Sequence, residues 1–182
     1  MQRQREEPYM AVIERFLGRR VEVPEDRHYD PKQGFWVLRE GQEVVFGLTE
    51  PALASIHGLH DVEWLTPDGR RVEQGEAVVF AITGKILYLD APCGGTIRFN
   101  HHVKKNPALA ARDPYGQGWL FRIRPDDGTA DALKEFIDAA TYVEGLRSSE
   151  GMKNSRGLKS SSTGMCHAVY KGIRHGLKGS CC

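Results

Sequence analysis

The sequence predicts a mainly β protein, a sandwich or barrel with one helix before it, one helix after it and a flexible C-terminal tail. Between residues 35 and 124, seven short runs of β-branched or aromatic residues are each bounded by Gly, Pro, Asp or Asn, which is typical of such folds. Apolar residues at helical spacing come before and after this region. The length of 182 residues, 40% of them hydrophobic and 27% charged, indicates one folded core with extensions and excludes a fibrous or wholly disordered chain.

Residues 1–23 are predicted to be an N-terminal helical extension. The apolar residues at helical spacing in PYMAVIERFLGRR (8–20) are Tyr9, Val12, Ile13, Phe16 and Leu17. A glycine and then Pro24 end the pattern. Because the polar face mixes both charge signs, we expect this helix to dock on its own domain and not on a membrane.

The body of the predicted domain spans residues 24–128. Its strands are FWVLR (35–39), EVVFGLT (43–49), DVEWL (61–65), EAVVFAI (76–82), KILYLD (85–90), GTIRFN (95–100) and WLFRIR (119–124). Two short helices are predicted between strands, at EPALASIHG (50–58) and NPALAAR (106–112). The predicted order is therefore helix, β body, helix.

Two further segments follow the body. Residues 129–147, TADALKEFIDAATYVEGLR, place apolar side chains mostly on one face and predict a closing helix. Residues 148–182 hold seven Ser and six Gly in 35 positions, the composition of a flexible tail. The net charge is +6 from residue 147 onward, so the total of +1 leaves −5 for residues 1–146. The tail is therefore basic and the body acidic.

Three of the four cysteines, Cys166, Cys181 and Cys182, lie in the tail, and only Cys93 lies elsewhere. The absence of CxxC pairs and of cysteines paired through the body favours a reducing compartment. No apolar run reaches the length of a membrane span and the N-terminus has no apolar signal region, so a cytoplasmic location is predicted. The tail is open to three interpretations: a solvated extension, a thiol or metal-binding element, or a basic segment that docks on an acidic partner. Because Tyr170 is its only aromatic residue, no nucleic-acid partner is predicted.

Other candidate groups favour structural roles. Two histidine pairs, His57-x-x-His60 and His101-His102, have no acidic or thiol residue at a suitable spacing, so no metal site is predicted. Asp113 and Tyr115 lie in Asp-Pro-Tyr-Gly, where Pro fixes φ and Gly accepts positive φ, which predicts a turn and not an acid–base pair.

The segment AITGKIL (81–87) predicts a β-hairpin whose tip presents Lys85. An apolar strand leads into Thr-Gly, one lysine follows, and a second apolar strand returns. A lysine amine is a nucleophile that can be acylated, and a tight turn exposes it with little bulk around it. The tip is therefore a candidate site for a covalently tethered group.

The residues around this hairpin follow an order that resembles the glycine cleavage H-protein family over about residues 24–128. The matching pieces are GFWV (34–37), VFGLTEPAL (45–53), VEWL (62–65), the Gly-Lys tip and DPYGQGWLFRIRP (113–125). DPYGQGW is the most specific of them, and the Gly-Lys tip is the functional one.

The resemblance implies a flattened lipoyl-type β-barrel sandwich of two antiparallel sheets, with lipoic acid in amide linkage to Lys85. It implies a carrier with no catalytic residue of its own, whose long arm visits several active sites in succession. The implied partners are a lipoate-attaching enzyme and three enzymes of glycine cleavage: a glycine-decarboxylating enzyme, a folate-dependent aminomethyl-transferring enzyme and a dihydrolipoyl-oxidising flavoprotein.

Two departures from the family pattern leave alternatives open. Ile82 stands where members commonly have a glutamate, and the return strand from Lys85 to Pro92 is one residue shorter than usual, which predicts a rearranged turn. The Thr-Gly-Lys tip and HYDPKQGFWV (28–37) are similar to divergent H-like carriers of a cytoplasmic sulfur-oxidising complex related to heterodisulfide reductases. In that setting the arm would carry sulfur-bearing intermediates. Independently of the setting, the tail cysteines are candidates for exchange with the dithiolane of the arm. The other alternative is an H-like binding or scaffold module without a lipoyl group.

Overall fold

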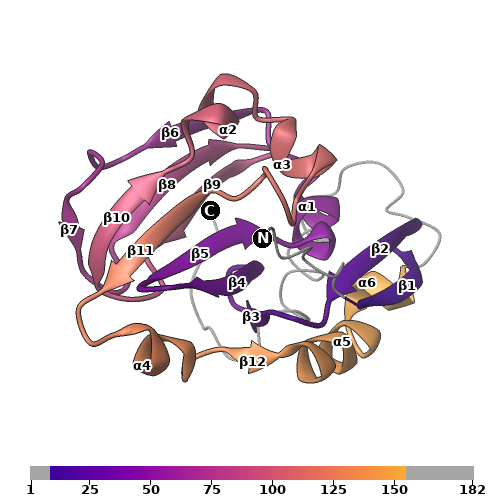
Figure 1. The fold of residues 1–182 in the computed structure, drawn as a ribbon. Coiled ribbons are helices and arrows are strands. Elements are labelled where there is room, and N and C mark those ends of the chain that lie inside the picture. Colours follow the sequence, from indigo (N-terminus) through magenta and orange to yellow (C-terminus); the bar gives the residue numbers. More distant parts are fainter. Residues whose placement is uncertain (1–8, 155–182) are drawn as a thin grey trace, which may run out of the picture.

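The computed structural model describes residues 9–154 and arranges them in antiparallel sheets with short helices at their edges (Figure 1). A seven-stranded sheet has the order β12-β3-β4-β5-β11-β10-β7. Its strands are β3 (His28–Asp30), β4 (Phe35–Glu40), β5 (Glu43–Leu48), β7 (Arg71–Val72), β10 (Gly95–Phe99), β11 (Phe121–Pro125) and β12 (Ile137–Asp138). A three-stranded sheet has the order β6-β8-β9, with strands β6 (Asp61–Trp64), β8 (Ala77–Ile82) and β9 (Ile86–Asp90).

The two sheets enclose the main core of the protein. Inward residues alternate with outward ones, as in β10, where Ile97 is fully buried and Arg98 is exposed. Aromatic rings fill the centre, and Phe46 stacks on Phe121 with 5.2 Å between ring centroids. The predicted mainly β sandwich of antiparallel sheets is confirmed, and every strand expected between residues 35 and 124 is present within one or two residues of its expected bounds.

The predicted N-terminal helix is wrong. Strands β1 (Met10–Phe16) and β2 (Arg19–Pro24) form an antiparallel hairpin in its place. Leu17 and Gly18 both have positive φ, 51° and 79°, and form the two-residue turn that suits such a hairpin. The pairing shifts register between Ile13 and Phe16, so these two buried residues lie three apart on the same side of a strand. Apolar residues three apart are also typical of one face of a helix, which is why the sequence pattern predicted one.

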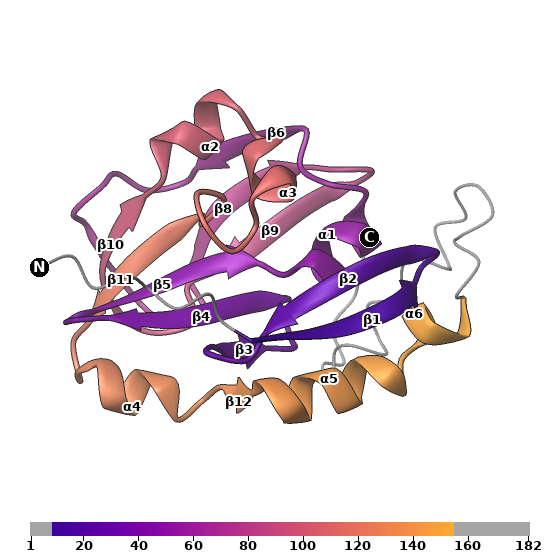
Figure 2. The same ribbon diagram turned by 45° about the vertical axis from the view of Figure 1, so that its right-hand side comes forward.

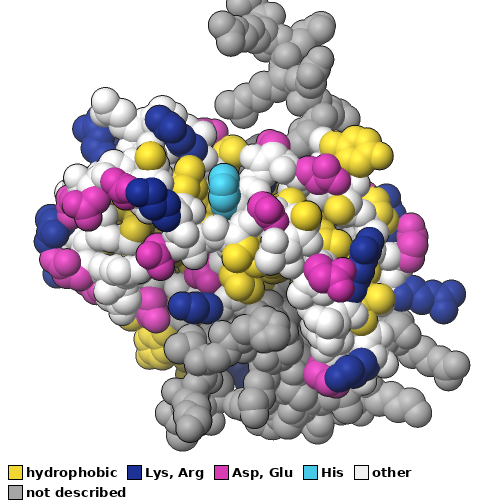
Figure 3. Space-filling view, turned by 90° about the horizontal axis from the view of Figure 1, so that it is seen from below, with side chains coloured by type: hydrophobic (Ala, Val, Ile, Leu, Met, Phe, Trp, Pro, Cys, Tyr) yellow, Lys and Arg dark blue, Asp and Glu magenta, His cyan; other side chains and the backbone are white. Residues whose placement is uncertain are grey.

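The single closing helix predicted over 129–147 is also wrong in part. The structure divides it into α4 (Thr129–Leu133), strand β12 and α5 (Ala139–Arg147). Ile137 and Asp138 pair with β3 at the edge of the long sheet, and the Asp138 carboxylate accepts a 2.8 Å hydrogen bond from Thr141 N, which starts α5. Seen from below, the face that includes these elements carries interspersed acidic, basic and apolar side chains (Figure 3).

The first residues of the predicted tail belong to the fold. Helix α6 (Glu150–Lys153) follows α5 and packs on β1, and Leu17 N, in the turn that follows β1, donates a 3.0 Å hydrogen bond to Gly151 O. Residues 155–182, and with them the three tail cysteines, lie outside the described residues.

A second core lies between the β1–β2 hairpin, α5 and the long sheet (Figure 2). Tyr29 and Tyr142 stack there with centroids 4.5 Å apart, and the Tyr142 hydroxyl lies 2.9 Å from Thr49 Oγ1. These contacts join α5 to the body of the sandwich.

The helix predicted at 50–58 is confirmed as α1 (Glu50–Ile56). Thr49 Oγ1 accepts a hydrogen bond from Ala52 N at its start, and Pro51 occupies its first turn. The segment predicted at 106–112 contains α3 (Leu109–Arg112), whereas α2 (His101–Lys105) was not predicted. Within residues 9–154, no helix combines the length and apolar character that a membrane span requires.

Candidate functional site

The β8–β9 hairpin holds Lys85 at its tip, as predicted. Ile82 and Ile86 form the last pair of the ladder, and Thr83, Gly84 and Lys85 make the turn. The buried Thr83 side chain bridges this turn, since its Oγ1 donates to Lys85 O at 2.8 Å and accepts from Lys85 N at 3.0 Å. One threonine therefore fixes the backbone that bears the exposed lysine.

The hairpin tip rests on the C-terminal end of α1. Gly84 N donates a 3.3 Å hydrogen bond to Ile56 O, and His60 N donates a 2.8 Å bond to Ile82 O. A Cβ atom on Gly84 would lie 3.7 Å from Cδ2 of His57. The base of the lysine is thus held in a defined place relative to α1.

The strands of this hairpin have unequal lengths. Five residue steps separate Ala77 from Ile82 on β8, whereas four separate Ile86 from Asp90 on β9. The extra residue is taken up by a register shift between Ala77 and Val79, where two successive valines are both fully buried. This bulge absorbs the unequal strand lengths, so that the inward alternation of the strands is kept up to the turn.

The outer face of the hairpin is apolar. Ile82, Ile86 and Tyr88 expose 41%, 66% and 56% of their surface, and they are three of the five large hydrophobic residues exposed among the described ones. Phe80 meets the Tyr88 ring edge-on, with centroids 5.4 Å apart. Apolar side chains therefore flank Lys85 on both strands, where an approaching partner would contact them.

The segment DPYGQGW forms a turn that locks several elements together. Asp113 Oδ2 accepts a 2.8 Å hydrogen bond from Gln117 N, and Trp36 Nε1 donates to Pro114 O at 2.8 Å. The Tyr115 hydroxyl donates to Glu22 O and accepts from Glu50 N, and its burial raises the pKa of Tyr115 well above its usual range. The structural role predicted for Asp113 and Tyr115 is confirmed.

The remaining candidates are the two histidine pairs and Cys93. Among residues 9–154 the structure brings no three His, Cys, Asp or Glu side chains together as a metal-binding group. Cys93 is half-buried against the main core, and burial, with a smaller contribution from Asp126, raises the pKa of its thiol to about 12.

An antiparallel sandwich that presents an exposed lysine on a fixed β-hairpin is the architecture of a swinging-arm carrier domain. Comparison with known proteins names the family. A family model described as "Glycine cleavage H-protein" matches residues 27–149. The glycine cleavage system H protein of a Thermus thermophilus strain is 39% identical over 130 residues, which cover 70% of this chain and 98% of that one.

Two further proteins that match the chain are also glycine cleavage system H proteins. The H protein of Bifidobacterium longum is 31% identical over 115 residues, covering 62% of this chain and 82% of that one. The crystal structure of a glycine cleavage system H protein from Mycobacterium marinum has a TM-score of 0.57 and 29% identity, and the match covers 67% of this chain and 97% of that one. The chain belongs to the glycine cleavage H-protein family. Members carry covalently bound lipoic acid on a lysine and are carriers, not enzymes.

Proposed function

We propose that Lys85 is the lipoyl attachment site and that the protein carries intermediates between partner enzymes on the resulting arm. The observation that carries this proposal is the position of Lys85, exposed on a turn that Thr83 bridges. Amide formation removes the lysine charge and places a dithiolane at the end of a long flexible chain. A tethered intermediate then reaches the next active site at a high effective concentration.

The proposed partners are those of glycine cleavage: a glycine-decarboxylating enzyme, an aminomethyl-transferring enzyme and a dihydrolipoyl-oxidising enzyme. The names of the relatives, glycine cleavage system H proteins, support this set. A lipoate-attaching enzyme would precede them, and its approach would meet the apolar flanks formed by Ile82 and Ile86. A cytoplasmic location is part of the same proposal.

A second candidate is a lipoyl carrier of a sulfur-oxidising complex related to heterodisulfide reductases. Two observations favour it. An exposed isoleucine, Ile82, occupies the position where family members commonly have a glutamate, and two arginines, Arg19 and Arg20, line a cavity close to the hairpin tip. A cationic surface near the arm suits anionic intermediates.

Intact-mass measurement on protein purified from its own host tests the attachment site. We expect one lipoyl increment in the wild type, its loss in Lys85→Arg, and its retention in Lys105→Arg, a matched change at an exposed lysine of α2. A wild-type protein without the increment would contradict the proposal and leave the non-lipoylated binding module as the explanation.

Affinity capture separates the two partner sets. Lipoylated wild type and Lys85→Arg serve as bait and control, so that only partners that need the arm differ between them. Capture of a glycine-decarboxylating enzyme supports glycine cleavage, and capture of subunits related to heterodisulfide reductase supports the sulfur route.

A further inference from the structure

The outward side chains of the three-stranded sheet form two cross-strand rows. In the first row Asp61 on β6 lies opposite Ile82 on β8, which lies opposite Ile86 on β9. The second row has the same order and consists of Glu63, Phe80 and Tyr88. Directly opposed residues of a sheet project to the same side. These six residues, here called the β6–β8–β9 face, therefore form one acidic column on β6 beside two apolar columns on β8 and β9.

The β6–β8–β9 face is open to a partner. Ile82, Ile86 and Tyr88 are exposed, and they belong to neither hydrophobic core. The Asp61 carboxylate accepts a 2.8 Å hydrogen bond from Val62 N but pairs with no Lys or Arg between residues 9 and 154. The face thus combines apolar surface with a carboxylate that is available to a cation.

A segment of the same chain has the matching pattern. Residues 165–178 lie beyond residue 149, where the family match ends. Apolar residues recur there every fourth position, at Met165, Val169, Ile173 and Leu177. At helical spacing the basic residues fall outside this apolar stripe, and they are Lys171, Arg174 and Lys178. No Asp or Glu follows Glu150, so the segment carries apolar and positive groups on different sides.

The stretch between α6 and this segment is long enough to reach the β6–β8–β9 face. Residues 155–164 separate Asn154 from Met165, and ten extended residues span up to about 35 Å. A compact domain of the described size has a radius of gyration of about 15 Å. The connecting stretch can therefore span the breadth of the body.

We propose that residues 165–178 dock on the β6–β8–β9 face of their own chain. The apolar stripe covers Ile82, Ile86 and Tyr88, and the basic side chains lie toward the acidic column of β6. A docked segment covers the apolar flanks of Lys85 on both strands. The inference does not rest on the attachment of lipoate to Lys85.

Tethering favours this occupant over others. An anionic membrane also attracts a basic segment with an apolar side, and a second copy of the chain presents the same face. The face of the same chain, however, is held within reach by the connecting stretch, so the segment meets it at a high effective concentration.

The test places a nitroxide at Cys182 of the full chain, with Cys166→Ala and Cys181→Ser. Cys93 stays in place, because burial raises the pKa of its thiol to about 12. Paramagnetic broadening of NMR signals, compared with the reduced nitroxide, shows which strands lie near the segment. A mixture of isotope-labelled chain without nitroxide and unlabelled chain with it detects contacts between copies.

Changes in the segment test its apolar stripe. We expect broadening in the isotope-labelled chain that bears the nitroxide to centre on β6, β8 and β9. Ile173→Asp should lower the docked-to-undocked ratio at least about tenfold, because a charged group replaces a buried apolar one. Leu158→Asp, in the connecting stretch, is the matched control and should change the ratio less than about twofold.

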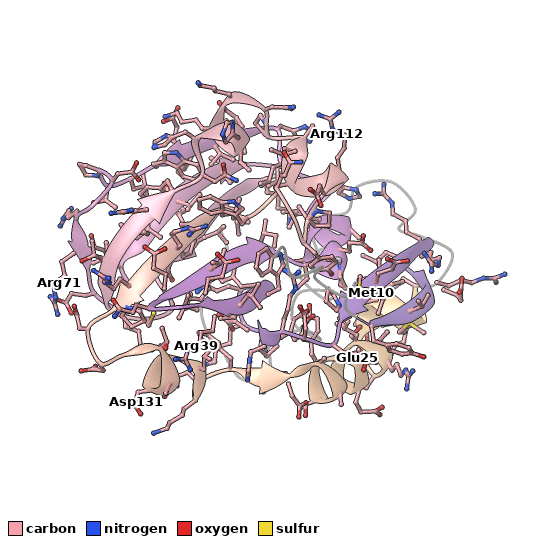
Figure 4. The ribbon with its side chains drawn as sticks, in the orientation of Figure 1. Met10, Glu25, Arg39, Arg71, Arg112 and Asp131 are labelled. Atoms are coloured by element: carbon pink, nitrogen blue, oxygen red, sulfur yellow. The ribbon has the colours of Figure 1, made fainter. Side chains whose placement is uncertain are left out.

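Changes in the face test the other side of the contact. Ile86→Ser should also lower the ratio, because it removes exposed apolar surface beside Lys85. Asp61→Lys should lower it about threefold, the size of effect that a surface ion pair has. Asp131→Lys makes the same charge change on α4, well away from β6 in Figures 1 and 4, and should have no effect.

Three results would overturn the inference. The first is broadening that is absent from β6, β8 and β9, including the case in which the chain binds phosphatidylserine vesicles instead. The second is broadening of these strands in the mixed sample to the same extent, which would place the segment on another copy. The third is a ratio that neither Ile173→Asp nor Asp61→Lys lowers. Backbone amide signals of β8 and β9 report whether each variant keeps its hairpin.

Discussion

A Cβ atom on Gly151 would lie 2.3 Å from Cε2 and Cζ of Phe16. Helix α6 therefore fits against strand β1 only because residue 151 has no side chain, and the main-chain bond from Leu17 N to Gly151 O holds the two elements at that distance. The N-terminal hairpin and helix α6 thus form one packed unit on the side of the sandwich.

Gly151→Ala should lower the free energy of unfolding by about 1–3 kcal/mol, because the added methyl group overpacks against a fully buried ring. Urea unfolding measures this difference. Gly145→Ala is the matched control, since a Cβ atom there meets nothing within 4 Å and the residue lies inside α5. That control should raise the stability by up to about 1 kcal/mol, and equal effects of both changes would contradict the packing of α6 on β1.

Ile82→Glu should increase the rate at which a lipoate-attaching enzyme of a glycine cleavage system modifies Lys85, by about tenfold. The change restores the glutamate that family members commonly have, and Ile82 is exposed enough that the new carboxylate stays solvated. Ile86→Glu places the same charge on the other strand and serves as control. Rates measured by intact mass that are unchanged by Ile82→Glu would show that this position does not limit recognition.

Asp30→Asn should stabilise the protein, relative to the wild type, more at neutral pH than at acid pH. Burial raises the pKa of the Asp30 carboxyl, although main-chain N–H groups of Lys32 and Gln33 act in the opposite direction. An acid whose pKa is higher in the folded state binds more protons there, so it costs stability as pH rises above its ordinary pKa. Asparagine keeps the acceptor for Lys32 N and has no charge. Urea unfolding at about pH 4 and pH 7 should show the advantage of the variant growing with pH.

Asp138→Asn should show the opposite dependence. The Thr141 N–H, which donates to the Asp138 carboxylate, lowers the pKa of this exposed group. The stability that the Asp138 carboxylate contributes is present above the ordinary carboxyl pKa. It is lost as pH falls through the lowered pKa of this group in the folded protein. The loss of unfolding free energy in Asp138→Asn should therefore shrink toward acid pH in the same urea experiments. Parallel plots of stability against pH for Asp30→Asn and Asp138→Asn would contradict the pKa directions given for both carboxyls.

Cys93 should resist alkylation by iodoacetamide at pH 8 in the folded protein. Burial raises the pKa of its thiol to about 12, so about one thiol in ten thousand is ionised at that pH. In denaturing urea the same cysteine should react within minutes. A chain with Cys166→Ser, Cys181→Ser and Cys182→Ser leaves Cys93 as the single thiol, and rapid labelling of this folded variant would contradict its burial.

The candidate site was predictable where its signal is local. The apolar runs on either side of Thr-Gly-Lys determine a hairpin, because residues that pair across its turn are only a few positions apart in the chain. The bulge at Val78 and the bridging role of Thr83 were not predicted. The Thr83 bridge is a local contact between a side chain and the main chain two residues away, whereas the bulge buries both Val78 and Val79 and so depends on packing in the core.

Local patterns in the amino-acid sequence were enough to predict the β sandwich, helix α1 and the place of Lys85 at a hairpin tip, since alternation, caps and turn residues act over short distances. Tertiary packing was needed to establish that residues 10–24 form strands, because the bulge between Ile13 and Phe16 produces a spacing that also suits a helix. Packing also places Arg19 and His57 in the lining of one cavity. These residues are far apart in the chain, and the packing of the hairpin on α1 is what brings them together.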